Sequence, residues 1–179
     1  MKIDGVKALA KIVCDRYGTE VHSALAVRGM APKLYGTSRV ENVLLIAMES
    51  LGDDWMTLFA YRQAFNTTMS QDTINKIILR IEEILKCLKE LGMVHGDLRD
   101  SNIMLRKGEE EKAILIDYDW AGKAGLVQYP LGRGNSSEYP GTPGGDIGEE
   151  DDSELFNSWR LKFTTRWPPR AQWDSPDSR

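Results

Sequence analysis

The chain runs His-Gly-Asp-Leu-Arg-Asp-Ser-Asn from His95 to Asn102 and Leu-Ile-Asp-Tyr-Asp from Leu115 to Asp119. Both stretches are rich in carboxylate and amide side chains, and only residues 103–114 separate them. Oxygen donors of this kind are hard ligands that suit Mg²⁺. These two stretches are therefore the candidate functional site, and the interpretation of the fold starts from them.

A β-hairpin is predicted between the two stretches. Residues 102–105 and 113–116 are short apolar runs, and the polar residues 106–112 join them. Two such runs with a polar connection that contains glycine are typical of a hairpin. If the connection forms the middle of the hairpin, Asn102 falls opposite Asp117 at its open end.

A long buried helix is predicted just before the first stretch. Apolar residues recur there every three or four positions, as expected for one face of a helix. Gly92 follows where a left-handed cap would end it. The residues on this face are Ile74, Ile77, Ile78, Ile81, Ile84, Leu85, Leu88 and Leu91.

The residue types in the two stretches suit phosphoryl transfer. That reaction requires metal ions on the phosphates, a carboxylate that orients the attacking hydroxyl, and positive charge beside the transferred group. The residues that can fill these roles are Asp97, Arg99, Asn102 and Asp117. A magnesium–nucleotide site is the physical interpretation.

The pattern of His-x-Asp, an Asn five residues after the Asp, and a later Ile-Asp-Tyr resembles the catalytic and metal-binding loops of protein kinase-like phosphotransferases. Gly96 and Arg99 resemble the aminoglycoside phosphotransferase and choline kinase branch, and also fungal kinase-like families. The resemblance implies an α+β fold with two lobes that uses ATP and Mg²⁺. It implies that Asp97, Arg99 and Asn102 are catalytic, and that Asn102 and Asp117 hold the metal.

A strand over residues 5–13 is predicted from alternation, and a short helix between Gly18 and Gly29 from its apolar stripe. By resemblance, this strand is the third strand of the kinase small lobe. Lys11 on it would hold the α and β phosphates. Glu20 on the helix is the expected ion-pair partner of Lys11.

A buried strand is predicted over residues 42–48, because this apolar run has polar residues on both sides. The residues that follow it resemble the kinase hinge. The resemblance implies that the carbonyl of Glu49 and the amide of Leu51 hydrogen-bond to adenine.

The chain becomes irregular after Gly125, where prolines and glycines cluster, and a helix is predicted only from Glu154 to Phe163. In the resembling families an aspartate that opens this helix accepts hydrogen bonds from amides of the catalytic loop. Asp152 matches that position, and Asp151 is the alternative.

Three segments follow from this interpretation. Residues 1–53 form part of a kinase small lobe with the hinge, residues 54–163 form part of the large lobe with the catalytic and metal-binding loops, and residues 164–179 form a polar, disordered tail. The residues before Lys11 contain the single Gly5, so no glycine-rich loop covers the phosphates. We therefore expect an incomplete small lobe, a shortened large lobe and slow phosphoryl transfer.

The composition of the chain limits the classes of partner that it can bind. With 179 residues and 41% hydrophobic residues, the chain is long enough for one real core. A net charge of −4 with scattered Lys and Arg makes nucleic acid an unsuitable partner, and no apolar run suits a membrane. The two cysteines, Cys14 and Cys87, are expected to be reduced thiols in a cytoplasmic protein. The partners expected are ATP and a hydroxyl acceptor that is a protein or a small molecule.

Other interpretations of the site residues remain. The chain is alternatively a nucleotide-binding pseudokinase or an inactive binding module, which the missing phosphate loop favours. A weaker alternative is a hydrolase that uses Asp97 and Asp117 as a carboxylate pair. Asp and Asn residues also cap turns in solvated loops. A calcium loop is excluded, because the EF-hand spacing and its twelfth-position Glu are absent.

Overall fold

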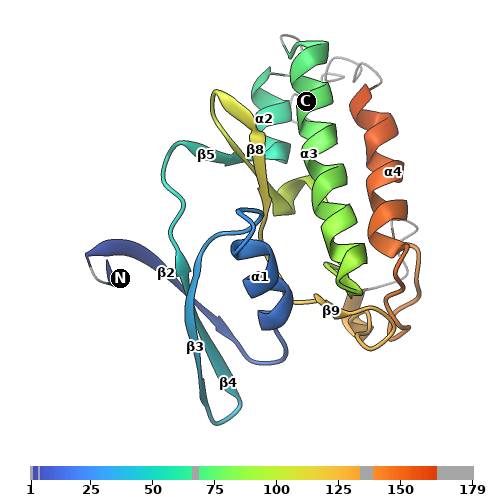
Figure 1. Cartoon of the computed structure of the whole chain (residues 1–179). Helices are drawn as coiled ribbons and strands as arrows, with labels where there is room; N and C mark the ends of the chain where they lie inside the picture. Colours follow the sequence, from blue (N-terminus) through green and yellow to red (C-terminus); the bar gives the residue numbers. More distant parts are fainter. Residues whose placement is uncertain (1, 4, 66–68, 134–138, 165–179) are drawn as a thin grey trace, which may run out of the picture.

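The computed structural model describes residues 2–3, 5–65, 69–133 and 139–164. They form a mixed α+β structure with antiparallel sheets, as predicted from the sequence (Figure 1). In chain order, the elements are β1 (Lys2–Ile3), β2 (Val6–Val13), α1 (Thr19–Ala26), β3 (Leu34–Val40), β4 (Val43–Glu49), β5 (Trp55–Thr57), α2 (Leu58–Phe65), α3 (Gln71–Glu90), β6 (Met93–Val94), η1 (Asp100–Asn102), β7 (Ile103–Arg106), β8 (Glu109–Leu115), β9 (Gly122–Lys123), η2 (Leu131–Arg133) and α4 (Asp151–Thr164).

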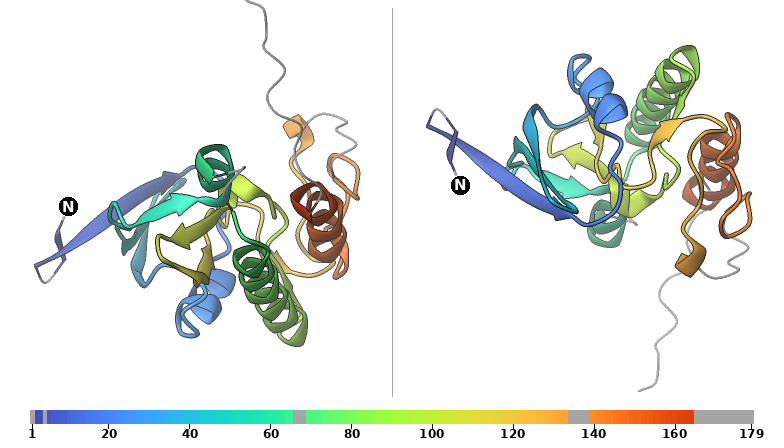
Figure 2. Two further views of the ribbon diagram at one scale, coloured as in Figure 1. Left: turned by 90° about the horizontal axis from the view of Figure 1, so that it is seen from above. Right: turned by 90° about the horizontal axis from the view of Figure 1, so that it is seen from below.

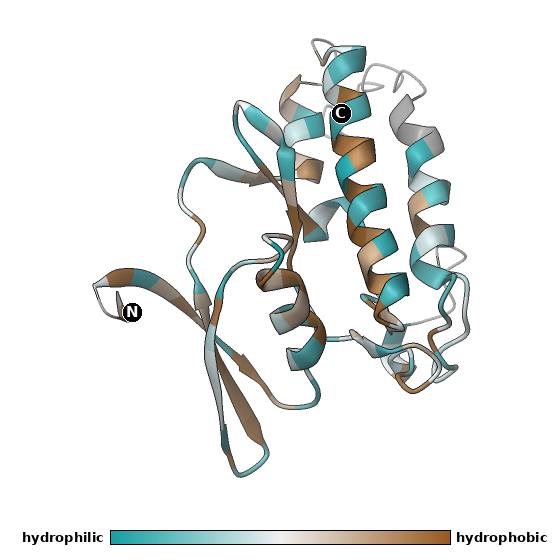
Figure 3. Ribbon diagram, viewed as in Figure 1, coloured by the Kyte–Doolittle hydropathy of each residue, from teal (hydrophilic) through white to brown (hydrophobic). Residues whose placement is uncertain are grey.

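The first sheet carries Lys11 and has the strand order β1-β2-β4-β3. All its pairings are antiparallel, and Lys11 lies opposite Ile46. One face of β4 is buried through Leu44, Ile46 and Met48. Figure 3 shows apolar residues along β2 and β4. The strands predicted over residues 5–13 and 42–48 are thus confirmed as β2 and β4. Before Lys11 the described chain holds only β1 and the start of β2, and no glycine-rich hairpin.

The predicted long helix is confirmed as α3. The Ser70 hydroxyl accepts a hydrogen bond of 3.1 Å from the Thr73 amide at its start, and Gly92 adopts φ +62° just after its end. The buried positions of α3 are Ile77, Ile78, Ile81, Ile84, Cys87 and Leu88. Burial of each such aliphatic side chain stabilises the folded state by about 1.5–3 kcal/mol. The buried face therefore holds α3 against β8 and α4 (Figures 1 and 2).

The predicted hairpin is confirmed as β7 and β8, but its connection is shorter than predicted. Ladder pairing already begins at Arg106 opposite Glu109, so residues 109–112 belong to a strand and not to a loop. Gly108 has φ +78°, which a tight hairpin turn requires. The strand β5 pairs with the outer side of β7 and was not predicted, because three residues carry no readable alternation.

The predicted helix near the end of the chain is confirmed as α4, which begins earlier than predicted, at Asp151. Residues 125–150, as far as they are described, contain only η2 and an isolated bridge between Gln128 and Asp146, as the irregular composition indicated. The predicted tail of residues 164–179 lies outside the described residues except for Thr164, which ends α4. In the described part of the chain, no helix is long and apolar enough to cross a membrane.

His22 links α1 to the chain around the site. Its ring is fully buried and stacks on Tyr118 with the two ring centroids 4.6 Å apart. Nε2 lies 2.8 Å from the Pro32 carbonyl, which can only accept, so Nε2 carries the proton and Nδ1 accepts from the Tyr17 hydroxyl at 2.8 Å. Burial lowers the pKa of His22, so the ring is held in its neutral form.

This neutral His22 predicts a pH dependence. Unfolded histidine binds a proton near pH 6.5, whereas folded His22 binds it only at lower pH, so the free energy of unfolding falls as the pH drops below about 6.5. We expect His22→Gln to reduce this slope by up to about 1.4 kcal/mol per pH unit. Urea unfolding from pH 7.5 to 5.5 measures it. Parallel pH curves for the two proteins would contradict the assignment.

Candidate functional site

The loop from Val94 to Leu98 is buried along its whole length. Gly96 has φ +79°, and a Cβ at this position would lie 2.8 Å from Cδ1 of Ile147 and 3.2 Å from Cβ of Trp120. Both the backbone conformation and the close approach therefore require glycine here. The Asp97 amide donates to Nδ1 of His95 at 3.3 Å, which holds the loop in a tight bend.

Asp152 anchors this loop from the first turn of α4. Its carboxylate accepts hydrogen bonds from the amides of His95, at 2.6 Å, and Gly96, at 2.9 Å. Asp152 is only 3% exposed, and burial raises the pKa of its carboxyl group. The prediction for Asp152 is confirmed. Asp151, the alternative, instead accepts from the Tyr129 hydroxyl and the Gly148 amide.

Asp97 lies at the centre of the site and is 5% exposed. Its Oδ2 accepts from Nδ2 of Asn102 at 2.8 Å and lies 3.2 Å from Nε of Arg99. Its Oδ1 accepts from the Tyr139 hydroxyl at 2.6 Å. The structure thus brings together the three side chains that the sequence named as catalytic.

Asn102 and Asp117 both lie at the open end of the hairpin. The Asn102 carbonyl accepts from the Ile116 amide at 3.0 Å, so Asn102 lies opposite Ile116. Asp117, which was predicted to lie opposite Asn102, is the next residue along the chain. Asp117 adopts φ +68°, a conformation uncommon outside glycine that turns the chain sharply after β8. Its side chain remains 38% exposed.

These two side chains fit Mg²⁺. Nδ2 of Asn102 donates to the carbonyl and carboxylate of Asp97, which leaves Oδ1 of Asn102 without a donor among the described residues. That oxygen and the Asp117 carboxylate are two oxygen donors at this end of the hairpin. Mg²⁺ is typically held by one or two carboxylates together with phosphates and water. No cluster of three His, Cys, Asp or Glu side chains suited to a metal occurs in the described ranges. A metal here would share its ligands between protein and nucleotide.

Lys11 reaches the same site from β2. Its Nζ lies 2.6 Å from Oδ1 of Asp117 and 2.6 Å from Oδ1 of Asp119. Burial lowers the pKa of Lys11, but hydrogen bonds to both carboxylates outweigh this effect and raise the pKa overall. Lys11 is therefore a fixed positive charge beside the candidate metal ligands.

The predicted ion pair between Lys11 and Glu20 is wrong. Among the described residues Lys11 pairs with Asp117 and Asp119, while Glu20 is exposed in the first turn of α1. The physical reason is the orientation of α1, because the Gly18 amide donates to the Tyr118 carbonyl at 2.8 Å just before the helix begins. This contact turns Val21 and His22 inward and Glu20 outward.

The predicted hinge residues lie at the end of β4. The Glu49 amide donates to the Lys33 carbonyl at 2.8 Å, and the Glu49 carboxylate accepts from the Lys33 amide at 3.1 Å. Leu51 lies beyond the strand, and over the described ranges its amide has no backbone acceptor. The amide is therefore free to donate to a ligand.

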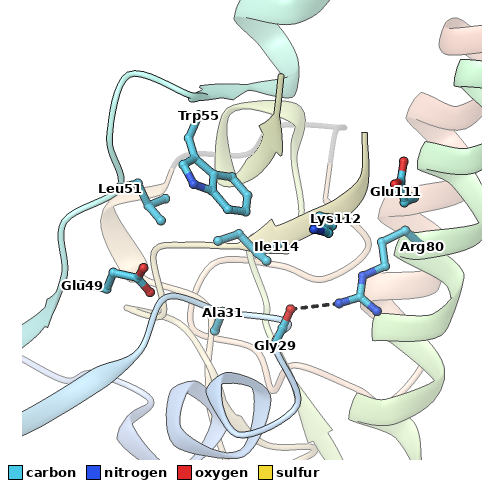
Figure 4. A pocket seen from close by; sticks show the side chains of 9 residues that line it. All are labelled: Gly29, Ala31, Glu49, Leu51, Trp55, Arg80, Glu111, Lys112 and Ile114. Atoms are coloured by element: carbon cyan, nitrogen blue, oxygen red, sulfur yellow. Dashed lines mark hydrogen bonds between the residues drawn. The ribbon is translucent and has the colours of Figure 1, made fainter. Parts of the chain in front are cut away.

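Glu49 and Leu51 also line a pocket of about 380 Å³ (Figure 4). Its other walls come from the α1–β3 loop, β5, α3 and β8, where Arg80 donates to the Gly29 carbonyl at 2.9 Å. Lys11, the catalytic-loop residues and Asp117 do not line it. The pocket is separate from the Asp97 site.

Three residues near the site were missed in the sequence. Asp119 is the second partner of Lys11, and its place in the same acidic stretch as Asp117 was the signal that could have identified it. Tyr139 and Arg133 lie in the segment rich in glycine and proline, where no periodic pattern distinguishes them.

Residues 30–125 match the model of the lipopolysaccharide kinase (Kdo/WaaP) family, and this range includes the predicted hinge residues, residues 95–102 and Asp117. A probable serine/threonine-protein kinase of fowlpox virus is 32% identical over 76 residues, which are 42% of this chain and 23% of the viral protein. The serine/threonine-protein kinase cot-1 of Neurospora crassa is 35% identical over 87 residues, 48% of this chain and 14% of cot-1.

A longer match reaches beyond the central region. The protein kinase YpkA of Yersinia pseudotuberculosis is 26% identical over 145 residues, 75% of this chain and 19% of YpkA. The matched regions span less than a quarter of the length of each of these three relatives. These matches agree with the kinase-like resemblance of residues 95–102 and 115–119.

Proposed function

The chain belongs to the lipopolysaccharide kinase (Kdo/WaaP) family and is a kinase-like protein, and from that premise we propose that it is an ATP- and Mg²⁺-dependent phosphotransferase. It would transfer the γ-phosphate to a hydroxyl of a protein or a small molecule. One observation carries the proposal: the Asp97 carboxylate already accepts a hydroxyl at 2.6 Å and is hydrogen-bonded to Asn102, which lies at the same end of the hairpin as Asp117. A hydroxyl acceptor, a base and metal ligands at one point are what phosphoryl transfer requires.

Each side chain has a role that follows from its position. Asp97 orients the acceptor hydroxyl and takes its proton late in transfer. Lys11, released from Asp117 and Asp119, holds the α and β phosphates. Arg99, whose side chain is 55% exposed beside Asp97, brings positive charge to the transferred group.

Asn102 and Asp117 are the residues that would hold Mg²⁺. When bound, the ion neutralises charge on the phosphate oxygens. The Asn102 side chain keeps its orientation without the ion, because Nδ2 is fixed on Asp97 and Oδ1 is turned away from those contacts. The arrangement is therefore preorganised, which reduces the cost of assembling it around a nucleotide.

We further propose that residues 1–53 and 54–163 act as small and large lobes with the nucleotide between them. The carbonyl of Glu49 and the free amide of Leu51 would hydrogen-bond to adenine.

A second candidate is a nucleotide-binding module that does not transfer phosphate. The observation that favours it is the Tyr139 hydroxyl, which occupies Oδ1 of Asp97 and so blocks the place of an external acceptor. Both functions require nucleotide binding. They differ in whether ADP is produced from Mg·ATP.

Thermal unfolding with ATP, with and without Mg²⁺, tests nucleotide binding. A ligand at one hundred times its dissociation constant stabilises the folded state by about 2.7 kcal/mol. We expect the increment to require Mg²⁺ and to be lost in Asp117→Ala, because that variant removes one of the two oxygen donors.

Asp119→Ala is the matched control. It removes the other carboxylate that Lys11 contacts, but leaves Asn102 and Asp117 in place. We expect it to keep the Mg²⁺-dependent part of the stabilisation. If Asp117→Ala retains the same metal-dependent affinity as the parent, the metal assignment is wrong.

A further inference from the structure

We propose that Tyr139 is an internal phosphate acceptor, which the active site of its own chain phosphorylates. The proposal rests on the proposed phosphotransferase function and names a first acceptor for it. Its starting point is the hydrogen bond of 2.6 Å from the Tyr139 hydroxyl to Oδ1 of Asp97. A base that takes the proton of an acceptor hydroxyl has to lie within hydrogen-bond reach of that hydroxyl, and this pair meets the requirement.

The two oxygens of Asp97 have different partners. Oδ2 is engaged by Asn102 and by Arg99, so it fixes the orientation of the carboxylate. Oδ1 contacts the Tyr139 hydroxyl and no other donor in the described part of the chain. Tyr139 therefore holds the one carboxylate oxygen that remains available to act as a base.

The ring of Tyr139 is held from several sides. The Trp120 and Tyr129 rings lie with their centroids 5.5 and 5.9 Å from the Tyr139 ring centroid. The Arg133 guanidinium lies over the same ring, 4.6 Å from its centroid. Aromatic pairs and cation–π contacts at these distances are favourable, so the hydroxyl is positioned by packing.

Arg133 supplies an independent observation. Its Nε and Nη1 are buried, and within the described ranges they have no hydrogen-bond acceptor. Buried donors without an acceptor are costly, and for a charged group the cost is higher. A phosphate group offers several strong acceptor oxygens and negative charge. Nη2 of Arg133 already donates to the Gly141 carbonyl. An anion that arrives at Tyr139 would give Nε and Nη1 the acceptors that they lack among the described residues.

The transfer step balances. Oη of Tyr139 attacks the γ-phosphorus of ATP, the Pγ–Oη bond forms, and the bond from Pγ to the bridging oxygen of the β-phosphate breaks, so that ADP leaves with the electron pair. The phenolic proton passes to Asp97 and then to solvent. Burial and the hydrogen bond to Asp97 raise the pKa of Tyr139, so the phenol is protonated at neutral pH and requires this base.

The test uses the full chain incubated with Mg²⁺ and ATP labelled at the γ-phosphate, followed by mass spectrometry of its peptides. We expect phosphate at Tyr139, formed at a rate per molecule that does not change with protein concentration, because the acceptor lies in the same chain. Tyr139→Phe should abolish this phosphate, and Asp97→Asn should abolish it while ATP binding persists. Tyr35→Phe, a matched change on β3, should leave the label intact.

The outcomes separate the two proposals. Production of ADP from Mg·ATP without phosphate at Tyr139 overturns this inference and leaves the proposed function standing. Stabilisation by Mg·ATP with neither ADP nor phosphate overturns this inference and favours the nucleotide-binding module. Equal labelling of Tyr139→Phe, or a rate per molecule that rises with protein concentration, also overturns it. Absence of any binding of Mg·ATP overturns both. The site is located in the unaltered protein, so the test does not depend on the folding of a variant.

Discussion

Asp97→Asn is expected to lower the turnover of Mg·ATP by about 10²–10⁴-fold and to leave the affinity for Mg·ATP unchanged. The range is the usual contribution of a positioned general base. An asparagine keeps the size of Asp97 and can still accept a hydrogen bond from Asn102, but it cannot take the proton of an acceptor hydroxyl. The binding contacts proposed for the nucleotide lie on Lys11 and Asp117, which the substitution does not touch.

ADP release in a single-turnover experiment measures this effect, with thermal unfolding in Mg·ATP as the binding readout. Asp72→Asn is the matched control, because Asp72 pairs with Lys76 on the exposed surface of α3, away from the site. We expect the control to behave as the parent does in both measurements. A variant at Asp97 that releases ADP as fast as the parent shows that this carboxylate is not the base.

The parts of the site that the sequence predicted are those fixed by local patterns. The apolar stripe of α3 is nearly uninterrupted, so the helix and its Gly92 end are where the periodicity placed them. The hairpin after Asn102 has two apolar strands, so the meeting of Asn102 with the residue before Asp117 follows from its register. Asp152 was located by resemblance, since nothing in its own neighbourhood distinguishes it from Asp151.

The features that were predicted wrongly or missed depend on contacts between segments far apart in the chain. The partner of Lys11 is decided by the direction in which α1 leaves Gly18, and that direction is set by Tyr118 and by Ala121, which packs against Gly18. No local pattern contains this information. Tyr139 is likewise positioned by the rings of Trp120 and Tyr129. The sequence around Tyr139 does not indicate these contacts.

Asp152→Ala is expected to lower the free energy of unfolding by about 2–4 kcal/mol. The substitution leaves the amides of His95 and Gly96 buried without their acceptor, and each such group costs about 1–3 kcal/mol. Part of this loss is offset, because burial of the carboxylate is itself unfavourable, as the raised pKa of Asp152 indicates. Urea unfolding at pH 7 measures the change.

Glu149→Ala provides the matched control, because Glu149 is exposed just before the same helix and should change stability by less than about 0.5 kcal/mol. The free energy of unfolding of Asp152→Asn should lie between those of the parent and Asp152→Ala, since the asparagine keeps one oxygen acceptor for the two amides. Equal stability of Asp152→Ala and Glu149→Ala would mean that the loop does not depend on this anchor.

The same substitution also separates a positioning role from a purely structural one. Asp152 touches neither the nucleotide nor the acceptor, but it holds the loop that carries Asp97, and a shift of about 1 Å in a catalytic group can cost about 10²-fold in rate. At a temperature where Asp152→Ala is folded, we therefore expect ADP release to fall by about that factor while Mg·ATP still stabilises the protein. Asp152→Asn should recover part of the rate. If the folded alanine variant turns over at the rate of the parent, Asp152 stabilises the fold without positioning Asp97.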